Sequence, residues 1–308
     1  MLALCIPEAL AMTIFCFGSI NIDHFYRLPH LPAPGETLAA RAMESGLGGK
    51  GANQSVAAAR AGARVVHLGA VGNDGGDALA RMQALGVDCS AVTLCAGART
   101  GHAVILTDDA GENSIVIHPG ANTAQDLDTV TAPLAQAELG DILLMQNETD
   151  LQPEVAERAV GLGMEVVYSA APFDVEAVRA VLPFINILIL NAIEAAQLQA
   201  ALGMEAEDLP VETVVVTRGA EGAEWIARGT PRIHTPAFAV DVVDTTGAGD
   251  CFTGTLAAAL DRGLAPEDAM CEAAAASALQ VTRHGTADAM PGAAEVAAFL
   301  AARTAQAG

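Results

Sequence analysis

Residues 142–168 read ILLMQNETDLQPEVAERAVGLGMEVVY, and this stretch decides the fold class. Short apolar runs at 142–145 and 165–168 flank a segment, 152–162, in which apolar residues recur at helical period. A strand, a crossover helix and a second strand make up the repeating unit of a parallel sheet. The stretch therefore predicts an α/β protein.

The same alternation extends along the chain in both directions. Further strands are expected at 14–17, 64–68, 187–190, 213–217 and 224–227. Further helices are expected at 52–61, 77–85, 174–181, 193–201, 249–262 and 266–281. This pattern is typical of a doubly wound sheet core flanked by helices.

Two segments, 22–45 and 98–118, break the rhythm, because they are rich in turn formers and lack a long helical period. The second contains HAVILTDDAGENSIVIH, two alternating runs around a Gly-containing loop, which predicts a hairpin. The two segments are either separate surface excursions or strands of one small β lid over the carboxyl ends of the core strands. In the second case the core comprises 12–21, 46–97 and 119–308, and residues 1–11 form a disordered extension.

Composition limits the partners. The chain has 308 residues, 52% of them hydrophobic, so disorder is excluded. The net charge is -22 and no basic run occurs, so neither nucleic acid nor an anionic membrane is an expected partner. An anionic ligand would have to be held by a few placed cations, a metal ion or backbone amides.

The six cysteines show no C-x-x-C pair and no zinc-site spacing, which favours reduced thiols in a cytoplasmic protein. The opening residues lack the basic region of a signal peptide. No window approaches the ~18 apolar residues of a membrane helix.

The strongest local signal is DTTGAGD at residues 244–250, followed directly by the apolar helix CFTGTLAAAL. The backbone N–H groups of Gly247, Ala248 and Gly249, together with the helix dipole, favour an oxyanion or a phosphoryl group. Asp250 would lie beside that anion and could act as a general base toward a hydroxyl. The alternative is that Asp250 only caps the helix.

A second signal, GGKGANQ at residues 48–54, opens the first long helix. It is not a G-x-x-x-x-G-K-[ST] phosphate loop, because Glu44 and Gly51 stand at two required positions. We expect the glycines to let a small polar ligand approach the backbone, with Lys50 and Asn53 donating hydrogen bonds. A plain helix entry remains the alternative.

Two weaker signals end strands. Asn21 and Asp23 alternate with apolar neighbours, so they share one face and could bind adjacent hydroxyls, although such residues are often turn formers. Asn191 and Glu194 follow the apolar strand NILIL and could equally be an ordinary helix start.

Together these motifs resemble the pfkB carbohydrate kinase family, specifically its ribokinase branch. The resemblance is carried, in order, by GSINIDH, PGET, GGKGANQ, AVGNDGGD, GENSIVIHPGAN, LLMQNET, VVVTRG, DTTGAGD and VTRHG. It implies ATP-dependent phosphorylation of a sugar hydroxymethyl group. It also implies a core sheet with a small β lid, through which a homodimer is expected to form.

The resemblance also implies roles for individual residues. Asp250 is expected to deprotonate the acceptor hydroxyl, and residues 247–249 to form the anion hole. The residues expected to contact the sugar are Asn21, Asp23, Gly49, Lys50, Asn53, Glu148 and Asp250. The lid residues expected to pack on its apolar face are Ala103, Ile115 and Ile117.

For the nucleotide, the resemblance implies that Asn191 and Glu194 lie near the triphosphate and Mg²⁺, and that Thr217 and Gly219 contact ATP. A K⁺-activating loop is expected from Asp244, Thr246 and carbonyls at or near Gln280, Arg283 and Gly285. Ala289 stands where the family often has a serine closing that loop, and Ala192 where an acidic residue is more usual.

D-Ribose is the expected substrate, giving ribose 5-phosphate. The alternatives are another kinase of the family, acting on fructose, a nucleoside such as adenosine or a deoxyketo acid, and a non-catalytic sugar-binding regulator on the same fold.

Overall fold

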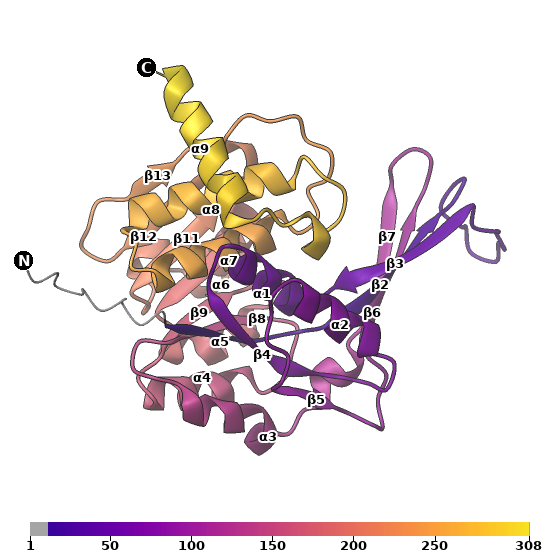
Figure 1. Cartoon of the computed structure of the whole chain (residues 1–308), viewed down its shortest axis with the longest axis horizontal. Coiled ribbons are helices and arrows are strands. Elements are labelled where there is room, and N and C mark those ends of the chain that lie inside the picture. The colour runs from indigo at the N-terminus through magenta and orange to yellow at the C-terminus, as the bar shows by residue number, and fades with distance from the viewer. Residues whose placement is uncertain (1–11, 308) are drawn as a thin grey trace, which may run out of the picture.

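A nine-stranded sheet forms the centre of the computed structural model, which describes residues 12–307 (Figure 1). Its strands are, in spatial order, β13 (Ile233–Thr235), β12 (Ala223–Ala227), β11 (Thr213–Thr217), β10 (Ile187–Asn191), β9 (Glu165–Ser169), β8 (Ile142–Gln146), β1 (Thr13–Phe17), β4 (Arg64–Val71) and β5 (Val92–Leu94). Strands β11 to β5 are parallel, and β12 and β13 are antiparallel additions at one edge. The predicted α/β core is confirmed.

Helices cover both faces of this sheet. One face carries α1 (Lys50–Arg60), α2 (Gly76–Ala84), α7 (Ala248–Asp261), α8 (Pro266–Gln280) and α9 (Ala293–Ala307). The other carries α3 (Leu127–Thr131), α4 (Gln152–Gly161), α5 (Val175–Val181) and α6 (Ala192–Leu202). Short 3₁₀ turns lie at η1 (Gly120–Thr123), η2 (Ala132–Gln136), η3 (Leu182–Phe184), η4 (Ala206–Asp208), η5 (Gly219–Glu221) and η6 (Ala287–Ala289).

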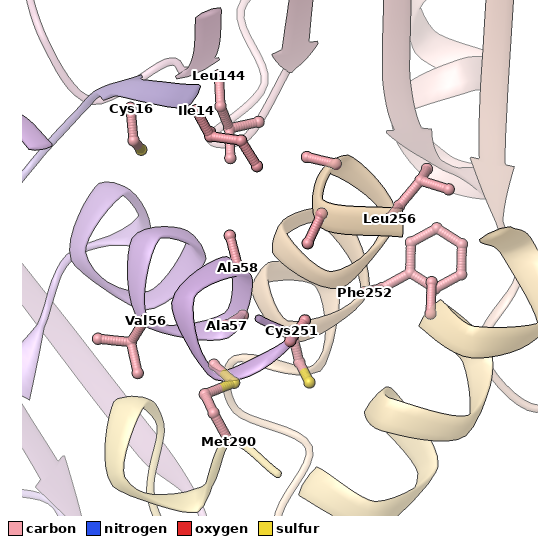
Figure 2. Close-up of a cluster of buried hydrophobic side chains, with 14 of the residues drawn as sticks. Ile14, Cys16, Val56, Ala57, Ala58, Leu144, Cys251, Phe252, Leu256 and Met290 are labelled. Carbon is pink, nitrogen blue, oxygen red and sulfur yellow. The ribbon is translucent and has the colours of Figure 1, made fainter. Parts of the chain in front are cut away.

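Strand β1 shows how the sequence divides the core between the two faces. Ile14 and Cys16 point into the cluster beneath α1 and α7, whereas Phe15 and Phe17 point into the cluster beneath α4. Figure 2 shows the first cluster, where the small residues of α1 and α7 allow these two helices to pack closely. This contact fixes the position of α7, whose first turn carries Asp250.

The two irregular segments pair into one small sheet, in the order β3 (Ala42–Gly48), β2 (Asn21–Arg27), β6 (Gly101–Thr107) and β7 (Asn113–His118). The predicted pairing is confirmed by the parallel register of β2 with β6. The sheet extends beyond the predicted boundaries, since Asn21 and residues 46–48 belong to it. It joins the core at the Asn21 end, and its far end projects away (Figure 1).

Some elements were not predicted. Strands β5 and β13 have three residues each, too few to show a period. Helix α9 does carry helical spacing in the sequence, at Val296, Phe299 and Leu300, and these side chains pack on the core. None of the helices between residues 12 and 307 has both the length and the apolar character needed to cross a bilayer.

Candidate active site

The carboxylate of Asp250 is buried at the start of α7 and is held by α1. It is 7% exposed. Its Oδ2 accepts a hydrogen bond from Asn53 Nδ2 at 3.0 Å, and its Oδ1 accepts one from Gln54 Nε2 at 3.0 Å. The N-cap residue is Gly247, whose φ of 79° is left-handed, and no side-chain hydrogen bond caps the helix. Asp250 is therefore not the helix cap, and its carboxylate points toward the junction of α1 and α7.

The loop before α7 offers fewer free backbone N–H groups for an anion than the sequence predicts. The N–H of Ala248 donates to the carbonyl of Thr245 at 3.2 Å, inside the loop's own turn. Within residues 12–307 the amides of Gly247 and Gly249 have no such acceptor. The anion-binding interpretation thus rests on these two glycines and the helix dipole, and only weakly on Ala248.

The glycines of the GGKGANQ motif allow two segments of backbone to approach closely. A Cβ on Gly49, whose φ is 90°, would lie 2.9 Å from Asn21 N, and one on Gly51 would lie 2.4 Å from Ser19 N. The backbone that approaches these glycines is the turn that follows β1. The result is a tight junction that places Asn21 and Lys50 in the same site.

Glu148 is oriented by this junction. Its Oε2 accepts hydrogen bonds from the Ser19 hydroxyl and, at 3.0 Å, from the Lys50 backbone N–H. Within the described residues its Oε1 has no hydrogen-bond donor, so it can accept a ligand hydroxyl. Burial, and then the charge of Glu148, raise the pKa of Asp23 to about 7.

The Lys50 ammonium lies among these acids. The negative charge of Asp250 raises the pKa of Lys50, against the opposing effect of burial. Glu148 and Glu194 add smaller contributions in the same direction. Lys50 therefore remains a cation. It places a positive charge where an anionic ligand could bind, although the chain as a whole is strongly negative.

Asn21 is held by a residue outside the predicted set. Asn122 Nδ2 donates to Asn21 Oδ1 at 2.8 Å, while Asn122 Oδ1 accepts from the Ile20 N–H at 3.0 Å. Asn21 therefore has its amide N–H groups left for a ligand. Asn122 lies in the quoted motif GENSIVIHPGAN, but its contact with Asn21 is visible only in the fold.

Two glutamines were also missed. Gln54 donates to Asp250 and, through Oε1, accepts from Gln146 Nε2 at 2.8 Å. Both glutamines are fully buried. Gln146 thus fixes the Gln54 amide with its nitrogen toward Asp250, which is the orientation that an ionised carboxylate needs.

The small sheet places some of its predicted residues together. Asp23, Ala103 and Ile117 are in register across β2, β6 and β7, so they share one face. Ala103 is buried at the base, whereas Ile115 and Ile117 are 53% and 55% exposed. In this structure the two isoleucines do not pack into the site.

Asn191 and Glu194 form an ordinary capping box at the start of α6. Asn191 Oδ1 accepts from the N–H of Glu194, and Glu194 Oε2 accepts from the N–H of Asn191. As the alternative interpretation predicted, Asn191 and Glu194 make the contacts of a helix start. Thr217 pairs with Asn191 across β10 and β11, and Gly219 follows with a φ of 56°. These four residues lie together at the carboxyl edge of the sheet.

The loop predicted to bind K⁺ is closed by side chains. Asp244 accepts hydrogen bonds from the N–H groups of Thr246 and Gly285, at 2.9 and 3.1 Å. Gln280 Nε2 donates to the carbonyls of the same two residues. The Arg283 guanidinium pairs with Glu295. No group of three or more His, Cys, Asp or Glu side chains suited to a metal ion occurs in the part of the chain that the structure describes.

Comparisons with known proteins show the family and the fold. The model of the pfkB family carbohydrate kinases matches residues 12–293. Ribokinase from Haemophilus influenzae is 35% identical over 94% of this chain and 98% of its own. Deoxyribokinase from Salmonella typhi is 31% identical over 91% and 96%. Ribokinase from Arabidopsis thaliana, solved with ribose and ATP, is 29% identical with a TM-score of 0.83, covering 94% and 99%.

Proposed function

This chain belongs to the pfkB family of carbohydrate kinases, and on that premise we propose that it transfers the γ-phosphoryl group of ATP to the primary hydroxyl of D-ribose, forming ribose 5-phosphate. One observation carries the proposal: Asp250 is buried at the N-terminus of α7, and its hydrogen-bond donors within residues 12–307 are two neutral amides. Each of its oxygens keeps a lone pair for a substrate proton.

The chemistry follows from this arrangement. The sugar hydroxyl gives its proton to Asp250 while its oxygen forms a bond to the γ-phosphorus, and the bond to ADP breaks. The amides of Gly247 and Gly249 and the α7 dipole stabilise the transferring group. Lys50 balances the charge between the acidic groups and the phosphates.

The nucleotide substrate is the Mg²⁺ complex of ATP. We assign its phosphates to the carboxyl edge where Thr217, Gly219 and the α6 N-terminus lie together. Glu194 Oε2 is occupied by the capping box, so Oε1 is the atom through which Glu194 would reach the ion or its waters.

For the sugar, Asn21, Asp23 and Glu148 offer an amide donor and two carboxylates at one end of the small sheet. A panel of D-ribose, 2-deoxy-D-ribose, D-fructose, adenosine and a deoxyketo acid tests this assignment by ATP consumption, with the phosphorylated carbon located by NMR. We expect the highest kcat/KM for D-ribose. The deoxyribokinase relative makes 2-deoxy-D-ribose the main rival. Sugar binding without any turnover would favour the regulator.

The pKa of Asp23, about 7, predicts a pH-dependent KM for the sugar. Below that pH the carboxyl binds a proton and becomes a weaker acceptor, so the KM should rise by up to about tenfold per pH unit while the KM for ATP stays level. Asp23→Asn should raise the KM and remove its pH dependence. Kinetics across pH 7 measure both effects, and a wild-type sugar KM that does not change with pH would contradict the assignment.

We also propose a cytoplasmic homodimer joined through the small sheet. Strand β7 is an exposed edge, and Met43, Ile115, Val116 and Ile117 are each about half exposed or more. Val116→Lys should shift the mass measured by light scattering from dimer to monomer. Val160→Lys, on α4 and 46% exposed, is the control that should leave the mass unchanged. A wild-type monomer at micromolar concentration would contradict the dimer.

A further inference from the structure

Gln280, the last residue of α8, joins two loops of the candidate site from a fully buried position. Its Nε2 donates to the Thr246 carbonyl at 2.8 Å and to the Gly285 carbonyl at 3.0 Å. Thr246 immediately precedes the Gly247–Gly249 loop, and Gly285 lies in the turn that follows α8. One side-chain amide therefore connects the proposed anion hole to the rest of the fold.

Asp244 makes the matching connection through the opposite backbone groups. Its carboxylate accepts the N–H groups of Thr246 and Gly285, while Gln280 binds their carbonyls. The N–H groups of Val243 and Asp244 also donate to the Val281 carbonyl, at 2.8 and 3.1 Å. The loop before α7 is thus fixed at the end of α8 by hydrogen bonds within the protein.

A monovalent cation does not fit this arrangement of hydrogen-bonded groups. Such an ion would need the Thr246 and Gly285 carbonyl oxygens as ligands, and Gln280 Nε2 already lies 2.8 and 3.0 Å from them, at the position that a shared cation would occupy. Ala289 offers no side-chain oxygen, and the Arg283 guanidinium reaches toward the Ala289 carbonyl at 3.5 Å, so a positive charge is already present.

We propose that the Gln280 side-chain amide takes the place of a monovalent cation and positions the Gly247–Gly249 loop without K⁺. The inference rests on the proposed kinase function for its effect on turnover. It departs from the K⁺ activation that the family resemblance implies. Gln280 touches no substrate, so it is a positioning residue.

A Gln280 side-chain amide with Oε1 and Nε2 exchanged predicts a different result. If Oε1 faced the two carbonyls, three oxygens would converge and repel one another unless a cation lay between them. Gln280 would then be a K⁺ ligand. The two orientations differ in how turnover and the melting temperature depend on K⁺.

The experiment uses the full chain at constant ionic strength, with tetramethylammonium, K⁺ or Tl⁺ as the chloride or nitrate salt. We expect wild-type turnover and the substrate-free melting temperature to be the same in K⁺ and in tetramethylammonium. Gln280→Ala should lose about 10- to 100-fold in kcat without K⁺, because the loop is no longer held in place. K⁺ should restore part of that loss and raise the variant's melting temperature.

Gln280→Glu is a second test, because its carboxylate would repel the two carbonyls and should bind a cation strongly. Gln199→Ala, on α6, is the matched control, since Gln199 Nε2 donates only to the exposed Glu205 side chain. A wild-type enzyme that K⁺ activates and stabilises, with both responses weakened in Gln280→Ala, would overturn the proposal. The melting and ²⁰⁵Tl binding measurements need no turnover, so they decide the matter even if no sugar is phosphorylated.

Discussion

Asp250→Asn should lower kcat by a factor on the order of 10² to 10⁴ while the KM values for sugar and ATP change little. The amide keeps the size of the carboxyl group but cannot accept the hydroxyl proton. It also directs an NH₂ group toward Asn53 or Gln54, which are both donors in the wild type. Steady-state kinetics with saturating sugar measure the loss.

Asp261→Asn is the matched control for this experiment. Asp261 ends the same helix, is also buried at 6% exposure, and lies outside the candidate site. Its substitution should leave kcat unchanged. If Asp250→Asn kept more than about a third of the wild-type rate, Asp250 would not be the base.

Much of this site could be predicted because its residues are local in sequence. The GAGD loop directly precedes an apolar helix, so the position of Asp250 at a helix N-terminus follows from the pattern alone. Likewise, the alternating runs at 102–118 predict a hairpin, although its pairing with the segment after β1 was only one of two alternatives. These features depend on short-range signals.

The contacts that orient the site could not be predicted in this way. Gln54 and Gln146 both lie in the quoted motifs, but they are far apart in the sequence, and no local pattern indicates that their side chains meet. Their chain of hydrogen bonds to Asp250 arises only when α1, α7 and β8 pack together. Gln280 is similar, because its carbonyl was expected to bind an ion while its side chain holds the loop instead.

Tertiary structure also changed the interpretation of two predicted site residues. Asn191 and Glu194 were expected near the triphosphate, and the structure uses their polar atoms to begin α6. The charge of Glu194 nevertheless affects Lys50, which places it near the site. The capping box and the expected ligand contact thus involve the same residues, and the sequence pattern is the same for both.

The last expected result concerns Gly254, which lies where α7 crosses α1. A Cβ there would lie 2.3 Å from the Gln54 carbonyl oxygen and 2.7 Å from Ala57 Cβ. In Figure 2 the side chains of Ala57 and Cys251 lie in this same cluster between the two helices. Neither neighbour is the end of a flexible side chain, so the helices themselves must separate.

Gly254→Ala should therefore lower the free energy of unfolding by about 1–3 kcal/mol, measured by urea denaturation, although alanine is the better helix former. Gly161→Ala, in α4, is the control: among the described residues, a Cβ added there would meet no atom within 4 Å beyond its chain neighbours and its own helix backbone, so this variant should gain about 0.5–1 kcal/mol. Turnover provides the second readout. Because α1 carries Asn53 and Gln54 and α7 carries Asp250, separating the helices lengthens both hydrogen bonds, and kcat should fall by up to about 10². Unchanged stability and turnover in Gly254→Ala would show that the crossing of α1 and α7 does not position the base.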